Sequence, residues 1–138
     1  TDLGADVVFD ATGVADVGGA VHELVGGAHV SIDCLGLAAT AHNSVHSLRP
    51  LGRHVQIGLF PSATDQFAIS RVIRDEVEVL GVHGLSASRV SHVLDLVRAG
   101  SLDPTTMIRQ RLRLDDIPVA LPAMGTFTAP GVSVAILG

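Results

Sequence analysis

The chain has 138 residues and a formal net charge of −5, with 47% hydrophobic and 17% charged residues. A nucleic-acid partner requires clustered Lys and Arg to neutralise phosphates, and the sequence has no such cluster. We therefore expect no nucleic-acid partner. The single cysteine, Cys34, excludes an internal disulfide and a zinc cluster built from cysteines.

The apolar content is high for so short a chain. A small domain has little interior, so this composition predicts surface that is buried against a partner or against further chain. The alternative explanation of the high apolar content is a sequence that is simply rich in Ala and Val. The chain begins with Thr1, and we expect it to be part of a longer protein. No signal peptide is visible, and Pro and Gly interrupt the uncharged stretch from Ile117 to Gly138, so we expect a cytoplasmic protein without a membrane span.

Strand and helix patterns alternate along the first two thirds of the chain. β-rich runs predict strands at residues 5–9, 29–35, 53–59 and 76–82. Apolar residues at helical spacing predict helices at residues 17–25, 41–48, 69–73 and 90–97. Asp16 is placed to cap the first of these helices, and turns are expected at Asp10–Gly13 and Leu51–Gly52. The alternation predicts an α/β fold with a parallel sheet.

The pattern changes after Pro104. Residues 111–114 alternate as a half-exposed strand does, Asp115 and Asp116 are placed to cap a helix over residues 117–124, and residues 132–136 alternate in a closing strand. Pro122 lies inside that helix and is expected to end or kink it. The C-terminal segment is therefore predicted to be strand, helix, strand.

Several short motifs follow one another at ordinary spacing, and their order resembles the C-terminal half of the zinc-containing medium-chain alcohol dehydrogenases. The motifs are Leu3–Asp6, Gly27–Gly36, Ser47–Leu59, Glu76–Gly84 and Leu112–Ile117. The resemblance implies a partial Rossmann-type parallel sheet. Residues 1–105 would be the second half of a nucleotide-binding domain, and residues 106–138 would return to the catalytic domain.

The resemblance also implies a binding site for NAD or NADP. In that family the backbone after strands five and six contacts the nicotinamide end, and the end of strand four lies near the adenine-side ribose. Matched residue by residue, the expected cofactor-binding residues are Ile57, Gly58, Leu59, Val82, His83, Gly84, Cys34, Leu35 and Gly36. Gly58 would allow close backbone approach. A purely structural role of the glycines, as strand ends, is the alternative.

Other parts of the family pattern are missing. The Gly-x-Gly-x-x-Gly turn that binds pyrophosphate does not occur here, and no zinc ligand can be matched. The resemblance therefore implies a zinc-dependent parent that acts on an alcohol or aldehyde, whereas the isolated chain is expected to be inactive. A non-catalytic truncated relative that acts as an oligomerisation or interaction module, and part of a zinc-free quinone reductase, are the alternatives.

The missing strands also predict unpaired sheet edges. In the family order, the run Val7–Phe9 would be strand three, separated from strand four by strands that are absent here. We expect Val7–Phe9 either to move beside residues 30–35 or to pair with another chain, and a homo-oligomer to form through residues 77–82 and possibly the edge of residues 30–35.

Two further candidate sites, a metal site and a nucleophilic cysteine, are weakly supported by the sequence. His42 and His46 stand four residues apart on a predicted helix, a spacing that can hold a metal, but two ligands are a weak signal and a solvated helix face is favoured. Cys34 is favoured as an inert thiol in an apolar strand over a nucleophile.

Overall fold

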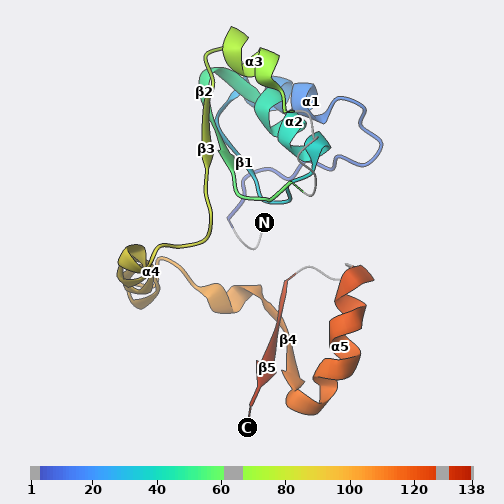
Figure 1. The fold of residues 1–138 in the computed structure, drawn as a ribbon, viewed down its shortest axis with the longest axis vertical. Helices are drawn as coiled ribbons and strands as arrows, with labels where there is room; N and C mark the ends of the chain where they lie inside the picture. Colours follow the sequence, from blue (N-terminus) through green and yellow to red (C-terminus); the bar gives the residue numbers. More distant parts are fainter. Residues whose placement is uncertain (1–3, 61–66, 127–130, 138) are drawn as a thin grey trace. The chain divides into compact units, whose positions relative to one another are not determined.

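The computed structural model describes residues 4–60, 67–126 and 131–137. The chain divides into two compact units, of which the first ends at Gly84 and the second begins at Leu85 (Figure 1). The first unit carries nine residues that the sequence predicts to bind a cofactor. The boundary expected at residue 105, between two domains of a dehydrogenase, stays a prediction.

The first unit is built on a parallel sheet of three strands. These are β1 (Ala28–Asp33), β2 (Leu48–Gln56) and β3 (Glu78–Gly81), paired in the order β1-β2-β3 (Figure 1). Helix α2 (Ala38–His46) connects β1 to β2, and α3 (Ile69–Arg74) lies between β2 and β3 in sequence. Crossovers that run in one direction along a parallel sheet place their helices on one face, and α2 contacts both β1 and β2 and also α3. The predicted α/β fold is confirmed.

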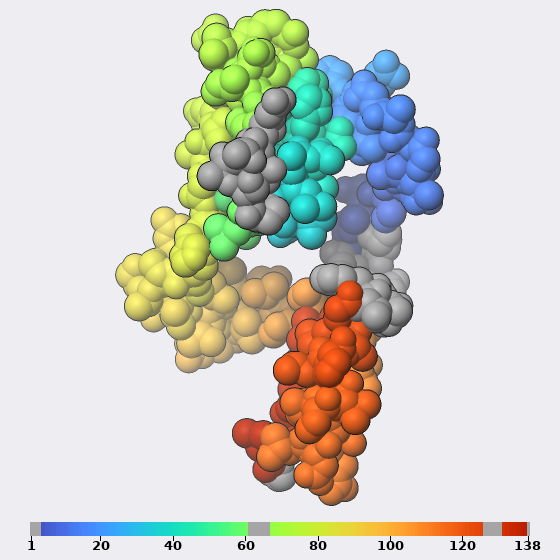
Figure 2. Space-filling model, turned by 45° about the vertical axis from the view of Figure 1, so that its right-hand side comes forward, coloured from blue at the N-terminus to red at the C-terminus, as the bar shows by residue number. Residues whose placement is uncertain are grey.

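Helix α1 (Val17–Val25) begins and ends where the sequence predicts. The Asp16 carboxylate accepts a hydrogen bond of 2.8 Å from the Gly19 amide, and Gly26 ends the helix at a φ of 70°. The helix packs against α2, and Figure 2 shows the two in contact. Gly18 faces this contact, because a Cβ at this position would lie 2.6 Å from the Cβ of His46.

The two faces of the sheet differ in an unusual way. Ser31, Asp33 and His54 point to the face that α2 covers, and all three are buried. The opposite face carries an apolar row of Ile32, Val55 and Leu80, which stand at paired positions on the three strands. Ile32 and Leu80 are 57% and 45% exposed, because no described helix covers this row. Three polar side chains of the sheet therefore lie on the covered face.

The run Val7–Phe9 forms no strand in the part of the chain that the structure describes. Val7 and Val8 are 60% and 71% exposed, and β1 pairs with β2 alone. The expectation that this run moves beside residues 30–35 is therefore wrong. A strand of only three residues, Val7–Phe9, would form few hydrogen bonds with β1, too few to offset the conformational entropy lost on pairing. The turn that follows is confirmed, since the Asp10 carboxylate accepts a 2.9 Å bond from the Thr12 amide.

The predicted boundary between the second helix and the next strand is also wrong. Helix α2 ends at His46, and Leu48, which matched the helical spacing, begins β2 and is fully buried. The turn expected at Leu51–Gly52 is instead a bulge inside β2, where the pairing jumps between Leu48 and Arg53. Leu51 has a φ of 60°, and its amide donates to the carbonyl of Asp75 over 2.8 Å.

The second unit contains a two-stranded parallel sheet. Its elements are α4 (Ala87–Arg98), the 3₁₀ turn η1 (Pro104–Met107), β4 (Ile108–Arg113), η2 (Leu114–Asp116), α5 (Ile117–Ala123), η3 (Met124–Thr126) and β5 (Val132–Ile136). Strands β4 and β5 pair in parallel, and α5 connects them in sequence. No helix in the described ranges has the length and apolar character needed to cross a membrane.

One detail of α5 differs from expectation, whereas the helix ends close to Pro122 as expected. The carboxylate of Asp116 does not cap α5 but accepts a 3.1 Å bond from the amide of Arg113, because the 3₁₀ turn η2 brings the chain back toward that residue. Pro122 lies inside the helix, which ends one residue later at Ala123. A proline so close to the C-terminal end removes only one backbone hydrogen bond.

The α1–α2 contact yields a stability prediction. Gly18→Ala should lower the free energy of unfolding by about 1–2 kcal/mol, because the overlap with α2 outweighs the better helix propensity of Ala. Gly81→Ala is the matched control, since a Cβ there would meet no atom within 4 Å. Urea denaturation followed by circular dichroism measures both variants. Equal midpoints would contradict the packing described for Gly18.

Candidate functional site

Two turns meet at the carboxyl edge of the parallel sheet. The backbone that leaves β1 passes through Gly36, and the backbone that leaves β2 passes through Gly58. A Cβ on Gly36 would lie 2.6 Å from the carbonyl carbon of Gly58, and a Cβ on Gly58 would lie 2.7 Å from the Cα of Gly36. Any side chain at either position would therefore separate the turns, which explains why both are glycine.

Asp33, the last residue of β1, holds the first turn. Its carboxylate accepts hydrogen bonds from the amides of Leu35 at 2.9 Å and Gly36 at 3.2 Å, from the Thr40 hydroxyl at 3.1 Å and from Gln56 Nε2 at 2.9 Å. The residue is only 4% exposed. Burial raises the pKa of Asp33, but these hydrogen bonds outweigh burial and hold the pKa below its ordinary value. The ionised carboxylate is therefore an integral part of the fold.

Asp33 and Gln56 also hold the second turn. The main-chain carbonyl of Asp33 accepts bonds from the amides of Ile57 at 2.9 Å and Gly58 at 3.0 Å. The side-chain amide of Gln56, the last residue of β2, donates both to the Asp33 carboxylate and to the Gly58 carbonyl, the latter over 2.7 Å. One carboxylate and one amide thus connect both turns.

A shallow hollow of about 300 Å³ lies beside the second turn. It is bordered by the residues that follow β2 and β3, namely Gln56, Ile57, Gly58, Leu59, Phe60, Gly81, Val82 and His83. The amide of Val82 donates to the carbonyl of Gln56 over 2.9 Å, so the two segments lie side by side. The hollow combines apolar side chains with main-chain N–H and C=O groups, which is the composition of small-molecule sites.

The structure brings together part of the predicted site. Ile57, Gly58, Leu59, Val82 and His83 all border the hollow. Gly36 contacts the same turn through its backbone, whereas Cys34, Leu35 and Gly84 do not border the hollow.

Cys34 differs from expectation. Its thiol is exposed in the turn that follows β1, so the predicted thiol within a strand is wrong. The strand ends at Asp33 because that carboxylate turns back to bind the amides of Leu35 and Gly36.

Sequence reasoning missed Asp33 and Gln56, which hold the predicted residues in place. The available signal was a carboxylate at the end of a strand, three residues before a glycine. Side chains of this kind commonly bind backbone amides of the following turn. The role of Gln56 carried no such local signal, because its partners come from two different strands.

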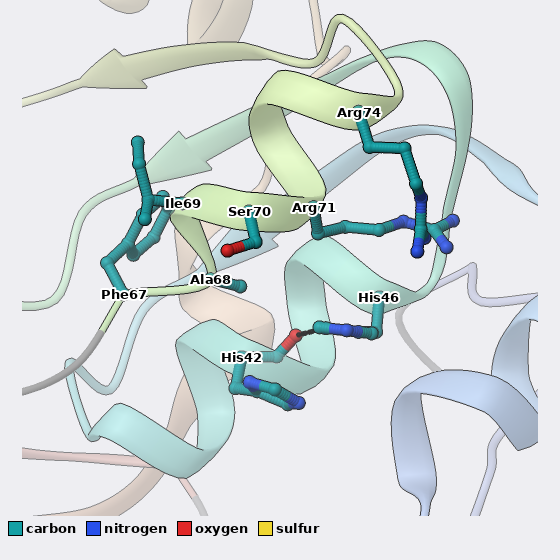
Figure 3. A pocket seen from close by; sticks show the side chains of 8 residues that line it. All are labelled: His42, His46, Phe67, Ala68, Ile69, Ser70, Arg71 and Arg74. Carbon is teal, nitrogen blue, oxygen red and sulfur yellow. Dashed lines mark hydrogen bonds between the residues drawn. The ribbon is translucent and has the colours of Figure 1, made fainter.

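A second hollow of about 300 Å³ lies between α2 and α3 (Figure 3). The rings of His42 and His46 stack there at 3.9 Å, and the His46 Nδ1–H donates to the carbonyl of His42. Asp75 forms ion pairs with both Arg71 and Arg74. The described ranges contain no group of three His, Cys, Asp or Glu side chains that could hold a metal. The preference for a solvated helix face over a metal site at His42 and His46 stays a prediction.

Comparison with known proteins shows the family to which the chain belongs. Residues 1–99 match the family model of the zinc-binding dehydrogenases, and the chain belongs to this family. The matched range contains the whole three-stranded sheet, both turns and the hollow beside them.

Individual relatives agree with the family. The chain is 27% identical over 119 residues to the probable D-xylulose reductase A of Emericella nidulans, a match that covers 86% of the chain and 32% of the reductase. The solved 2R,3R-butanediol dehydrogenase of Bacillus subtilis superposes with a TM-score of 0.84 at 19% identity, over 99% of the chain and 39% of that protein. A solved NAD-dependent alcohol dehydrogenase gives a TM-score of 0.81 at 26% identity, with the same coverage. The chain thus spans between about a third and two fifths of the length of these relatives.

The role of Asp33 yields a pH prediction. Asp33→Asn should lower the free energy of unfolding by about 2 kcal/mol at neutral pH, because hydrogen bonds to a charged acceptor are lost. The folded pKa lies below the unfolded pKa, so this stabilisation is complete above the unfolded value and is lost as the pH falls through the folded value. The difference between the two proteins should therefore shrink as the pH falls from about 6 to about 2.

Chemical denaturation at several pH values measures this difference. Asp95→Asn is the control, because the Asp95–Arg98 ion pair is exposed on both sides and should add little stability. A difference for Asp33→Asn that stays constant down to pH 2 would show that the pKa of Asp33 is the same in the folded and unfolded chain, which would contradict its lowering by these hydrogen bonds.

Proposed function

We propose that this chain forms part of the cofactor-binding surface of an NAD(P)-dependent alcohol dehydrogenase. The observation that carries the proposal is the pair of touching glycine turns, fixed by Asp33, next to a hollow at the carboxyl edge of a parallel sheet. Ligands of open α/β sheets bind at this edge. Membership of the zinc-binding dehydrogenases and the likeness to an NAD-dependent alcohol dehydrogenase support the same conclusion.

The hollow fits the nicotinamide end of such a cofactor. Main-chain groups of residues 57–59 and 82–84 would bind the carboxamide, and the exposed apolar side chains of Ile57, Leu59 and Val82 would contact the ring. Residues 34–36 would lie near the adenine-side ribose. When bound, the cofactor accepts or donates a hydride; the residues of this chain bind and orient it.

Asp33 does not act as an acid or base in this proposal. Its carboxylate is buried, holds four hydrogen-bond donors and has a lowered pKa, so it stays ionised and its oxygens are occupied. The described residues do not fit the zinc of the family, since they contain no suitable group of ligands. The alcohol or aldehyde substrate and the metal would therefore be bound by residues outside the described set.

A second candidate function is oligomerisation. The apolar row of Ile32, Val55 and Leu80 supports it, as do the exposed residues Glu78–Gly81 of the edge strand β3. In this reading copies of the chain associate through residues 77–82 or the edge of residues 30–35. Sedimentation velocity over a range of concentrations tests this function independently of any cofactor.

A cytoplasmic location fits the exposed free thiol of Cys34.

Cofactor binding tests the main proposal. We expect titration with NADH, followed by amide resonances in NMR spectra, to shift the signals of Ile57, Gly58, Val82 and His83. Val82→Asp should weaken binding by about tenfold or more, because it places a charge in an apolar hollow. Val79→Asp is a matched control, since both valines are 43% exposed and Val79 does not border the hollow.

Two results would contradict the proposal. One is the absence of saturable shifts at these four amides while the chain is folded. The other is equal weakening by Val79→Asp and Val82→Asp, which would place the ligand elsewhere.

A further inference from the structure

A buried row of polar side chains continues from the two turns into the interior. His54 Nε2 lies 3.0 Å from Gln56 Oε1, and His54 Nδ1 lies 3.2 Å from the hydroxyl of Ser31 and 3.1 Å from that of Ser44. His54 is fully buried, and Ser31 is 9% exposed. The row joins three elements, since Ser31 is on β1, Ser44 on α2, and His54 and Gln56 on β2.

The partners of this row determine where its protons lie. Gln56 Nε2 faces the Asp33 carboxylate and the Gly58 carbonyl, which only accept, so the side-chain nitrogen must occupy that side and the oxygen must face His54. An amide oxygen only accepts as well, so His54 Nε2 carries a proton and donates it. The two serine hydroxyls can both donate and accept, so they are compatible partners for His54 Nδ1. These contacts thus require a proton on Nε2 of His54.

We propose that His54 is a positioning residue for the two turns. By donating to Gln56 Oε1 it holds the Gln56 amide in the one orientation that donates to both Asp33 and Gly58. The reversed amide would place its oxygen against the Asp33 carboxylate and the Gly58 carbonyl, which is a contact between acceptors. The orientation of one buried imidazole thus sets the geometry of residues 34–36 and 57–59. Its bearing on cofactor binding rests on the proposed function, whereas its effect on the turns does not.

The location of the row favours positioning over general stabilisation. Burying a polar group costs free energy unless it is hydrogen-bonded, and apolar side chains could fill the space under α2 without this requirement. The chain instead buries Ser31, Asp33 and His54 under the helix, beside the apolar side chains of Ala41 and Val45. Directional contacts that end at Asp33 and Gly58 give a geometry that apolar packing could not specify.

The first experiment measures the proton positions in the unaltered chain. Long-range ¹⁵N–¹H NMR spectra distinguish the two tautomers of a histidine from its protonated form. We expect Nε2 of His54 to carry a proton, because its partner is the oxygen of Gln56. A proton on Nδ1 alone, with Nε2 unprotonated, would overturn the inference.

The second experiment compares two variants by hydrogen exchange. His54→Leu removes the donor, and we expect amide protection at Leu35 and Gly36 to fall about tenfold relative to the amides of α1, the factor that corresponds to ~1.4 kcal/mol. His54→Gln keeps an N–H at a similar reach and should restore part of this protection. Gln56→Glu is a second route to the same loss, because a carboxylate cannot donate to Asp33.

A control separates this effect from a general loss of stability. Val45→Ala removes a fully buried side chain of α2 outside the polar row. It should lower protection throughout the unit, without a selective change at Leu35 and Gly36. An equal selective loss in Val45→Ala, or unchanged relative protection in both His54→Leu and Gln56→Glu, would overturn the inference.

Titration with NADH distinguishes this inference from the proposed function. If the turns loosen in His54→Leu but the unaltered chain binds no NADH, the proposed function fails and the positioning role stands. If NADH binds equally well to the unaltered chain and to a folded His54→Leu variant, His54 does not position the cofactor site. We expect His54→Leu to weaken NADH binding by about tenfold.

Discussion

The close approach of two backbones at Gly36 and Gly58 is the constraint on which the rest of the site depends. Parallel strands end at one edge of a sheet, but only glycine allows the turns that follow them to touch. Asp33 stabilises this contact with its carboxylate on one side and its carbonyl on the other. The hollow beside the second turn follows from this geometry, because the backbone after β2 is held next to the backbone after β3.

The sheet shows how a partial fold distributes polar and apolar groups. Its polar residues lie under α2, where each finds a partner in the row from Ser31 to Asp33. Its apolar residues Ile32, Val55 and Leu80 lie on the other face. In doubly wound folds helices cover both faces of a parallel sheet, whereas no described helix covers this row. The chain spans 39% of the length of the two solved dehydrogenases compared with it.

Most of the first unit could be predicted from sequence patterns. The helical spacing around Val21 and the β-rich run around Val30 predicted α1 and β1, because local periodicity reflects burial on one face. Leu48 could not be placed this way, since it satisfies the helical spacing and also begins a strand. The run Val7–Phe9 failed because strand formation depends on a neighbour, which local sequence does not reveal.

The candidate site was predicted by resemblance rather than by pattern. That route named Ile57 and Val82, which border the hollow, while their role in cofactor binding stays a prediction. It missed Gln56 and His54, whose roles depend on which side chains three separate elements bring together. Long-range hydrogen bonds of this kind leave no periodic signal in a sequence, so only coordinates show them.

The contact between the two glycine turns can be measured directly. In NMR spectra of the folded chain, the account predicts a strong nuclear Overhauser effect between the amide proton of Gly36 and the α-protons of Gly58, together with slow exchange of the Gly36 amide. Absence of this effect in a chain whose β1 and β2 remain paired would show that the turns lie apart. The account of the site would then be contradicted.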